Sequence, residues 1–209
     1  MRSPVTVLTA TIPGREELLA QTIKSVYEQT VEVDSHLICA QSCTEGIFAP
    51  IHGAAQQNQL LTAATTEFVM RLADDDQLLP HHIATVLPYL DDADVCYTFD
   101  ANHNRPRVDC NGWSSERLVA EFTRQNWIDA SAAVIRTSLL RQVGGWPTDW
   151  IGPPGFGGGG HFAGTNINCE DWAAWYHLAC AGARFVCVPE DTWLYGIGDW
   201  GRSSTTNGR

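Results

Sequence analysis

The sequence predicts an α/β fold in which a mostly parallel central sheet carries helices on both faces. One observation is the alternation, through the first hundred residues, of short β-branched segments with segments whose apolar residues recur at helical spacing. Crossover connections join strands and helices in that order and make consecutive strands parallel. The other observation is size, because 209 residues that are 44% hydrophobic can bury one substantial core. We therefore expect a single domain over residues 1–209.

The first half of the chain, residues 1–100, supplies most of the expected strands. Residues 4–10 (PVTVLTA) are short and β-branched, and residues 11–14 (TIPG) break this first strand. The next helix has apolar residues on one side and charged residues on the other. The alternation continues with a strand at 35–40, a loop at 41–51, a helix at 54–64, a strand at 68–72, a helix from Pro80 and a strand at 95–99.

The second half, residues 101–209, is expected to be less regular. After a polar stretch we expect a helix at 114–126, a strand at 130–136, helices at 137–143 and 169–182, a strand at 184–188 and a tail from Pro189. The Gly- and Pro-rich stretch 146–168 is long enough to be either disordered or a flexible loop that acts as a lid. All eight tryptophans lie at or after Trp113, and Trp146 and Trp150 flank the loop, where an exposed ring could stack on a sugar. A nucleotide-binding half followed by an acceptor-binding half is the expected organisation.

The most informative stretch is Asp74-Asp75-Asp76, which follows the strand at 68–72. Three adjacent carboxylates repel one another and resist burial, so they favour water or a neighbouring cation. Taken alone, such a triplet is more typical of a solvated acidic turn. In an α/β sheet, however, ligands bind at the carboxyl ends of the strands, where this triplet lies. Oxygen ligands in that position suit a hard divalent ion such as Mg²⁺ or Mn²⁺.

Charge and composition argue against several classes of protein. The net charge of −11 and the lack of a clustered basic run disfavour general nucleic-acid binding and attachment to an anionic membrane. The sequence shows no secretory signal and no apolar run long enough to span a bilayer, so we expect a cytoplasmic protein. Seven cysteines without a C-x-x-C pair are typical of buried thiols in a reducing compartment.

The order of the motifs resembles the nucleotide-sugar glycosyltransferases of the GT-A fold, family 2 in particular, over roughly residues 4–196. The resemblance is carried by the acidic triplet after a strand, Gly144-Gly145-Trp146, Glu170-Asp171-Trp172 and Val188-Pro189-Glu190. None of these motifs is specific alone, whereas their order and spacing together are. The resemblance implies a GT-A-like domain and contacts to a nucleotide diphosphate sugar from Thr11, Pro13, Arg15, Asn58, Asp74, Gly145 and Trp146.

The metal site implied by the resemblance is the family's D-x-D motif, whose acids ligate a divalent metal that bridges the donor diphosphate. Aligned on Pro80, the longer D-x-D-D form matches Asp75 and Asp76 and leaves Ala73 in place of its first acid. If the triplet is itself the D-x-D, the pair is Asp74 and Asp76 instead. We favour Asp75 and Asp76 as the ligands of Mn²⁺ or Mg²⁺.

The Glu-Asp-Trp motif implies the chemistry. In the family its second acid is the catalytic base, which makes Asp171 the expected base with Glu170 beside it. Asp171 would take the proton of an acceptor hydroxyl as this attacks the donor sugar opposite the leaving diphosphate, and such a single displacement inverts the anomeric centre. The expected activity is that of a metal-dependent inverting hexosyltransferase, and the acceptor is a glycan, a protein or a hydroxylated nucleobase.

Two departures from the family pattern keep other functions open. Residues 39–42 (CAQS) lack the usual acid that reads the nucleotide base, and residues 195–198 (YGIG) lack the late histidine, for which His161 or water is the available substitute. A nucleotidyltransferase is one alternative, although residues 11–15 make a poor phosphate-binding loop. A non-catalytic sugar- or nucleotide-binding module of the same fold is the other.

Overall fold

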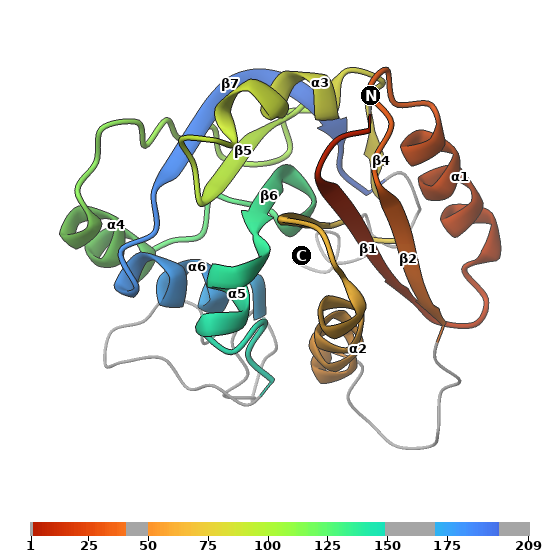
Figure 1. Ribbon diagram of the computed structural model, residues 1–209, viewed down its shortest axis with the longest axis horizontal. Helices are drawn as coiled ribbons and strands as arrows, with labels where there is room; N and C mark the ends of the chain where they lie inside the picture. Colours follow the sequence, from red (N-terminus) through yellow and green to blue (C-terminus); the bar gives the residue numbers. More distant parts are fainter. Residues whose placement is uncertain (1, 41–49, 149–169, 197–209) are drawn as a thin grey trace, which may run out of the picture.

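A mixed sheet of seven strands lies at the centre of the part of the chain that this computed structural model describes, residues 2–40, 50–148 and 170–196 (Figure 1). Its strand order is β2-β1-β3-β6-β5-β7-β4. The strands are β1 (Val5–Thr11), β2 (Ser35–Ala40), β3 (Phe68–Arg71), β4 (Gln77–Leu78), β5 (Val95–Asp100), β6 (Ala133–Arg136) and β7 (Phe185–Leu194). β1 pairs in parallel with β2 and β3, and β5 with β7, whereas β6 runs antiparallel between β3 and β5.

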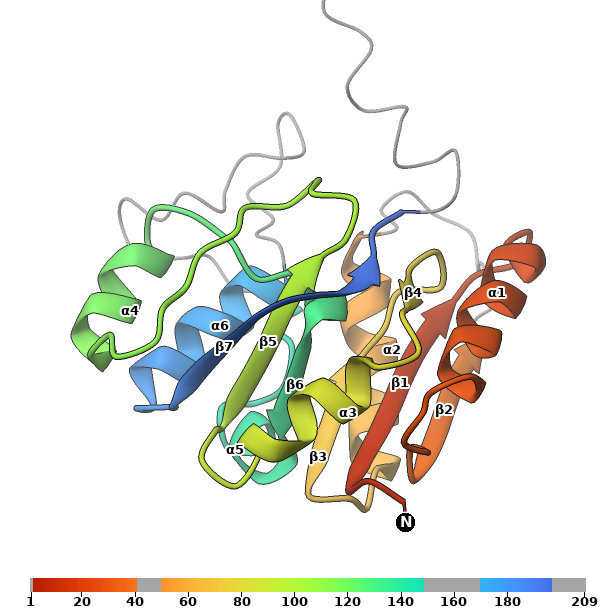
Figure 2. The same cartoon turned by 90° about the horizontal axis from the view of Figure 1, so that it is seen from above.

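Helices cover both faces of the sheet, which confirms the expected α/β class (Figures 1 and 2). α1 and α3 lie on one face, and α2, α5 and α6 lie on the other, where α4 packs against α6. The helices are α1 (Glu16–Tyr27), α2 (Pro50–Ala63), α3 (His82–Val86), α4 (Ser115–Phe122), α5 (Thr137–Gln142) and α6 (Glu170–Cys180), with 3₁₀ turns at Leu87–Tyr89 and Ala130–Ala132. Among these described helices, none combines the length and the apolar character needed to cross a membrane.

The register of β1 and β3 explains where the acidic triplet lies. Leu8 is opposite Arg71, so β3 ends three residues before β1 does. Continuing that register brings Asp74 level with Thr11, the last residue of β1. Both strands are buried over almost their whole length because their side chains are apolar or small. The carboxylates therefore begin beyond the end of β3, level with the last residue of β1.

β7 is longer than expected and continues through residues predicted to form a tail. Tyr97 is opposite Cys187, and Phe99 is opposite Asp191, so β7 carries two extra residues at this point. Pro189 lies inside this irregularity, where its missing N–H interrupts no regular ladder. The bulge lets the strand run on to Leu194, where it pairs with β4 and carries Tyr195 and Gly196 to the end of the sheet.

Five of the six tryptophans that the structure describes are buried in the core of the second half. Trp146, Trp175 and Trp193 are among the largest fully buried side chains, and Trp127 and Trp172 are also buried. The expectation that the Trp146 ring is exposed is therefore wrong. Its indole packs inside because a large apolar ring gains more from burial than from solvent. Trp150 lies outside the described residues.

Candidate active site

The ends of β1 and β3 place Arg15 between two carboxylates of the triplet. Arg15 Nη1 lies 3.2 Å from Asp74 Oδ1, and Arg15 Nη2 lies 2.6 Å from Asp75 Oδ2. The Thr11 hydroxyl donates to the other Asp74 oxygen, Oδ2, at 2.6 Å. Burial raises the pKa of Asp74, and the Thr11 hydroxyl and the Arg15 charge oppose that rise. Thr11, Arg15 and Asp74, expected to share one site, are thus in direct contact.

Asp76 points away from this cluster, toward the end of β7. Its side chain is buried, and Oδ1 accepts a hydrogen bond of 2.7 Å from the backbone N–H of Gly196. Burial raises the pKa of Asp76 well above its usual range, and the nearby Asp129 carboxylate adds to the rise, while the Ser131 hydroxyl and Gly196 N–H oppose it. Adjacent residues of one triplet therefore face two environments.

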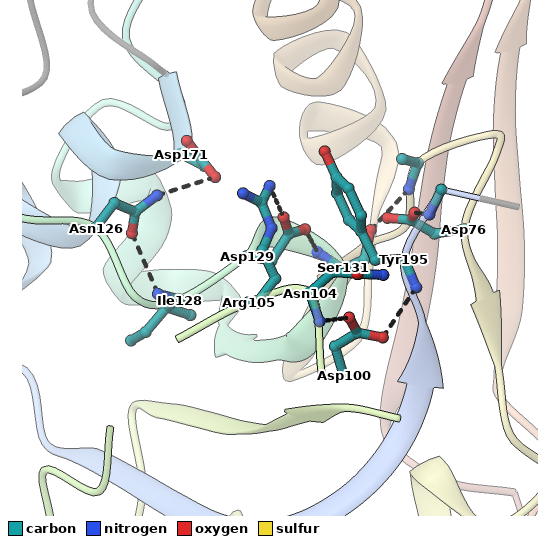
Figure 3. A network of polar contacts seen from close by, with 12 residues as sticks. Asp76, Asp100, Asn104, Arg105, Asn126, Ile128, Asp129, Ser131, Asp171 and Tyr195 are labelled. Atoms are coloured by element: carbon teal, nitrogen blue, oxygen red, sulfur yellow. Dashed lines mark hydrogen bonds and ion pairs between the residues drawn. The ribbon is translucent and has the colours of Figure 1, made fainter. Parts of the chain in front are cut away.

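A group that the sequence did not indicate lies beside Asp76. Arg105 Nη2 is 2.5 Å from Asp129 Oδ2, and the Arg105 guanidinium lies over the Tyr195 ring, 4.2 Å from its centroid. The other Asp129 oxygen caps the turn Ala130–Ala132 by accepting the Ser131 N–H at 3.1 Å. Figure 3 shows Asp129, Arg105 and Tyr195 between Asp76 on one side and Asp171 on the other. They come from segments that are far apart in sequence, and Arg105 and Asp129 belong to no motif found in the sequence.

Asp171 lies in the first turn of α6 and faces this group from the far side (Figure 3). Burial raises the pKa of Asp171 to about 7, the Glu170 and Asp129 carboxylates add to the rise, and the Arg71 charge and the Trp172 N–H oppose it. Its Oδ1 accepts the Trp172 N–H at 2.7 Å, and the Asn126 amide lies 3.5 Å from Oδ2. Asp171 as a whole residue is partly exposed, so it combines a perturbed pKa with some access to solvent.

Glu170, predicted beside the base, is held by Arg71 from the end of β3. Arg71 Nη2 lies 2.8 Å from Glu170 Oε1, and both side chains are mostly buried. This ion pair connects β3, which precedes the acidic triplet, to α6, which begins at Glu170.

Asn58, Gly145 and Trp146 form a contact that is structural in character. The Asn58 side-chain amide donates to the Trp146 carbonyl at 2.7 Å and accepts the Trp146 N–H at 2.9 Å. Gly145 has a φ of +77°, and an added Cβ would lie 3.1 Å from Asn58 Cγ. The Gly-Gly-Trp segment is thus fixed against α2 through its backbone. The indole of Trp146 faces the core, and the role of Trp146 as a donor contact stays a prediction.

Pro13, His161 and the expected loop remain among the predicted parts of the site. Pro13 follows β1 in an exposed turn next to Arg15. His161 and residues 149–168 of the expected loop lie outside the described residues. Asn58 and Gly145 stay predictions as donor contacts.

The acidic triplet provides oxygen ligands for a divalent cation. Both Asp74 oxygens are engaged by Thr11 and Arg15, whereas Asp75 is paired with Arg15 through Oδ2 and Asp76 accepts the Gly196 N–H at Oδ1, so Asp75 and Asp76 stay the predicted metal ligands. Within residues 2–40, 50–148 and 170–196, no group of three or more His, Cys, Asp or Glu side chains is arranged around a common centre for a metal. Mg²⁺ commonly uses only one or two carboxylates, with water and substrate phosphates completing its shell, so two aspartates fit this mode.

Comparison with known proteins relates the fold to glycosyltransferases of the GT-A type. No protein-family model matches the sequence, and a search of curated proteins finds no match either. Among solved structures, S. aureus TarS 1-349 in complex with UDP-GlcNAc aligns with 93% of this chain and 58% of its own, at 14% identity and a TM-score of 0.61. The mannosyltransferase PcManGT from Pyrobaculum calidifontis, in complex with GDP-Man and Mn²⁺, aligns with 96% of this chain and 59% of its own, at 15% identity and a TM-score of 0.63.

These likenesses confirm the GT-A-type fold expected from the sequence. Identities this low show a shared fold and not a shared substrate. The chain spans about three fifths of the length of TarS 1-349 and PcManGT, and 37% of the longer TarS chain.

Proposed function

We propose that this chain is a metal-dependent, inverting glycosyltransferase that moves a sugar from a nucleoside diphosphate to an acceptor hydroxyl. The observation that carries the proposal is the position of Asp171 at the start of α6, across from Asp76 of the acidic triplet that follows β3 (Figure 3). A base on one side and a group of carboxylates on the other suit a displacement in which nucleophile and leaving group occupy opposite faces of the sugar. The shared fold with TarS and PcManGT, solved with UDP-GlcNAc and with GDP-Man and Mn²⁺, supports this direction.

Asp171 would act as the general base. A carboxylate with a pKa of about 7 is partly ionised at neutral pH and is a stronger base than an ordinary aspartate. It takes the proton of the acceptor hydroxyl while the acceptor oxygen bonds to the anomeric carbon. The bond from that carbon to the diphosphate oxygen breaks at the same time, and the electron pair leaves with the diphosphate. A single displacement of this kind inverts the anomeric centre.

The other end of the site would receive the leaving group. Asp75 and Asp76 would hold Mn²⁺ or Mg²⁺, whose charge stabilises the developing negative charge of the diphosphate. Arg15 fixes Asp74 and Asp75 at the end of β1 and contributes a permanent positive charge there. Arg105, stacked on Tyr195 and paired with Asp129, offsets part of the negative charge between the two ends.

The donor would be a nucleoside diphosphate sugar. The acceptor would be a glycan, a protein or a hydroxylated nucleobase. We expect the protein to work in the cytoplasm.

A thermal-shift screen tests donor and metal together. UDP, GDP, UDP-GlcNAc and GDP-mannose are each added with and without Mn²⁺, because a ligand that binds only the folded state raises Tm. We expect at least one nucleotide to raise Tm more in the presence of Mn²⁺ than the sum of the separate effects. Additive effects throughout would contradict a joint donor–metal site.

Product analysis separates the candidate reactions. Sugar transfer releases a free nucleoside diphosphate, whereas a nucleotidyltransferase acting on a nucleoside triphosphate releases pyrophosphate. Binding without any release in the presence of Mn²⁺ and a range of acceptors would favour the non-catalytic module.

A further inference from the structure

The ion pair between Arg71 and Glu170 joins two elements that carry the proposed site. Arg71 is the last residue of β3 and is followed by Leu72, Ala73 and the acidic triplet, whereas Glu170 is the first residue of α6. Arg71 Nη2 lies 2.8 Å from Glu170 Oε1, with side chains 17% and 21% exposed. An ion pair this sheltered is poorly screened by solvent, so its geometry is well defined and the loss of one partner is costly.

Helix α2 passes close to this ion pair. A Cβ added at Gly53 would lie 3.9 Å from both Arg71 Nη2 and Glu170 Oε1. The backbone of α2 therefore approaches the pair without a side chain of its own at this position. The guanidinium and the carboxylate are thus enclosed by three elements, β3, α2 and α6.

Four charged groups face Asp171 from the elements packed around it. Glu170 on α6 and Asp129 before the turn Ala130–Ala132 are negative, and both raise the pKa of Asp171. Arg71 on β3 is positive and lowers it, and Arg105, in the loop after β5, also interacts with Asp171. Arg71 is paired with Glu170, and Arg105 with Asp129, so each arginine offsets one of the two acids.

We propose that Arg71 is a positioning residue, which fixes Asp171 for the reaction by anchoring Glu170 and the first turn of α6 to the end of β3. This inference rests on the proposed function, because it assigns Arg71 a role toward the proposed base. Arg71 does not touch the reacting atoms in this role. It keeps the Glu170 carboxylate in place and neutralised, and so sets the charge that Asp171 experiences.

The inference predicts opposite effects for the two partners of the ion pair. In Arg71→Gln the Glu170 charge is left without its partner, so Asp171 is harder to ionise. In Glu170→Gln the repelling charge is removed and the Arg71 charge is left, so Asp171 is easier to ionise. A purely structural contact would instead respond in the same direction to the loss of either partner.

The titration of Asp171 can be followed without any substrate. Thermal unfolding is measured from pH 5 to pH 9 for each protein and for the same protein carrying Asp171→Asn. The pH above which the Tm difference between the two stops changing, which we call the midpoint, reports the pKa of Asp171 in the folded protein. We expect this midpoint to rise by about one unit in Arg71→Gln and to fall by about one unit in Glu170→Gln. Arg184→Gln, which removes an exposed arginine, serves as the matched control and should leave the midpoint unchanged.

Shifts in the same direction, or no shift in either variant, would overturn the proposal. Arg71→Lys retains the positive charge and should return the midpoint toward that of the wild type. If Arg71→Gln does not fold, the other two variants still test the proposal. The midpoint should then fall in Glu170→Gln and stay unchanged in Arg184→Gln, and any other result would overturn the proposal. Because no donor is present, a failure of sugar transfer does not affect this result, and the two hypotheses fail separately.

Discussion

Replacing Gly145 by alanine tests the physical reason for the Gly-Gly-Trp segment. The residue has a φ of +77°, a left-handed conformation that costs alanine about 1 kcal/mol. The new Cβ would also overlap the Asn58 side-chain oxygen, so Asn58 must turn away and lose both hydrogen bonds to the Trp146 backbone. At about 1 kcal/mol for each hydrogen bond, the total loss of stability is about 3 kcal/mol.

A loss of this size is easy to measure by thermal unfolding followed by circular dichroism. For a protein of this length, 3 kcal/mol lowers Tm by roughly 6–12 °C. Gly144→Ala is the matched control, because Gly144 has a φ of +94° but no atom within 4 Å of an added Cβ. We expect that variant to lose only about 1 kcal/mol, or roughly 2–4 °C.

A double variant isolates the contact with Asn58. In an Asn58→Ala background the clash is absent, so Gly145→Ala should cost only the backbone strain of about 1 kcal/mol. Equal Tm losses for Gly144→Ala and Gly145→Ala in the wild-type background would refute the steric explanation. The same conclusion would follow if Gly145→Ala were equally destabilising with and without Asn58.

Three further predictions concern the carboxylates. Because folding raises the pKa of Asp171 from 3.8 to about 7, its contribution to stability is present below pH 4 and lost as the pH rises to 7. Asp171→Asn should thus be more stable than wild type at pH 8, by about 2 kcal/mol once the partial exposure of Asp171 is allowed for. Stability is measured by chemical denaturation, and equal stability of the two proteins at pH 8 would contradict the raised pKa of Asp171. Replacing Asp75 and Asp76 together by alanine should abolish Mn²⁺-dependent nucleotide binding in calorimetry, and unchanged binding would remove them as metal ligands. Thr11→Val should lower the free energy of unfolding by about 1–3 kcal/mol, because buried Asp74 loses a hydrogen-bond donor, and an unchanged value would show that this bond is dispensable.

The sequence predicted the fold and the placement of residues best where a local pattern of apolar and charged residues also marks the end of a strand. The strand expected at 68–72 is confirmed as β3 (Phe68–Arg71), so the acidic triplet follows a buried strand as expected. Asp74 and Asp76 are themselves buried, where they accept hydrogen bonds from Thr11 and Gly196. The proximity of Thr11, Arg15 and Asp74 also agrees with expectation. Here the parallel register of β1 and β3 brings together residues that the order of motifs had already placed at strand ends.

Other parts of the site depend on contacts that no local pattern records. Arg105 and Asp129 come from irregular segments, and only the folded sheet brings them to Tyr195. The Trp146 ring was expected to be exposed because Trp146 lies beside a Gly-rich stretch, whereas the ring fills the core. The extension of β7 beyond Pro189 was missed because proline usually ends a strand, and only the bulge opposite β5 accommodates it.

The release of free nucleoside diphosphate tests the proposed function most directly. Wild type, Asp171→Asn and Asp92→Asn are incubated with Mn²⁺, UDP-GlcNAc or GDP-mannose and a panel of acceptors; Asp92 is a surface carboxylate that is 89% exposed. We predict that wild type and Asp92→Asn release the diphosphate at similar rates. Asp171→Asn should release it at least a hundredfold more slowly, while donor binding is retained. Release by Asp171→Asn at the wild-type rate would contradict the assignment of Asp171 as the base.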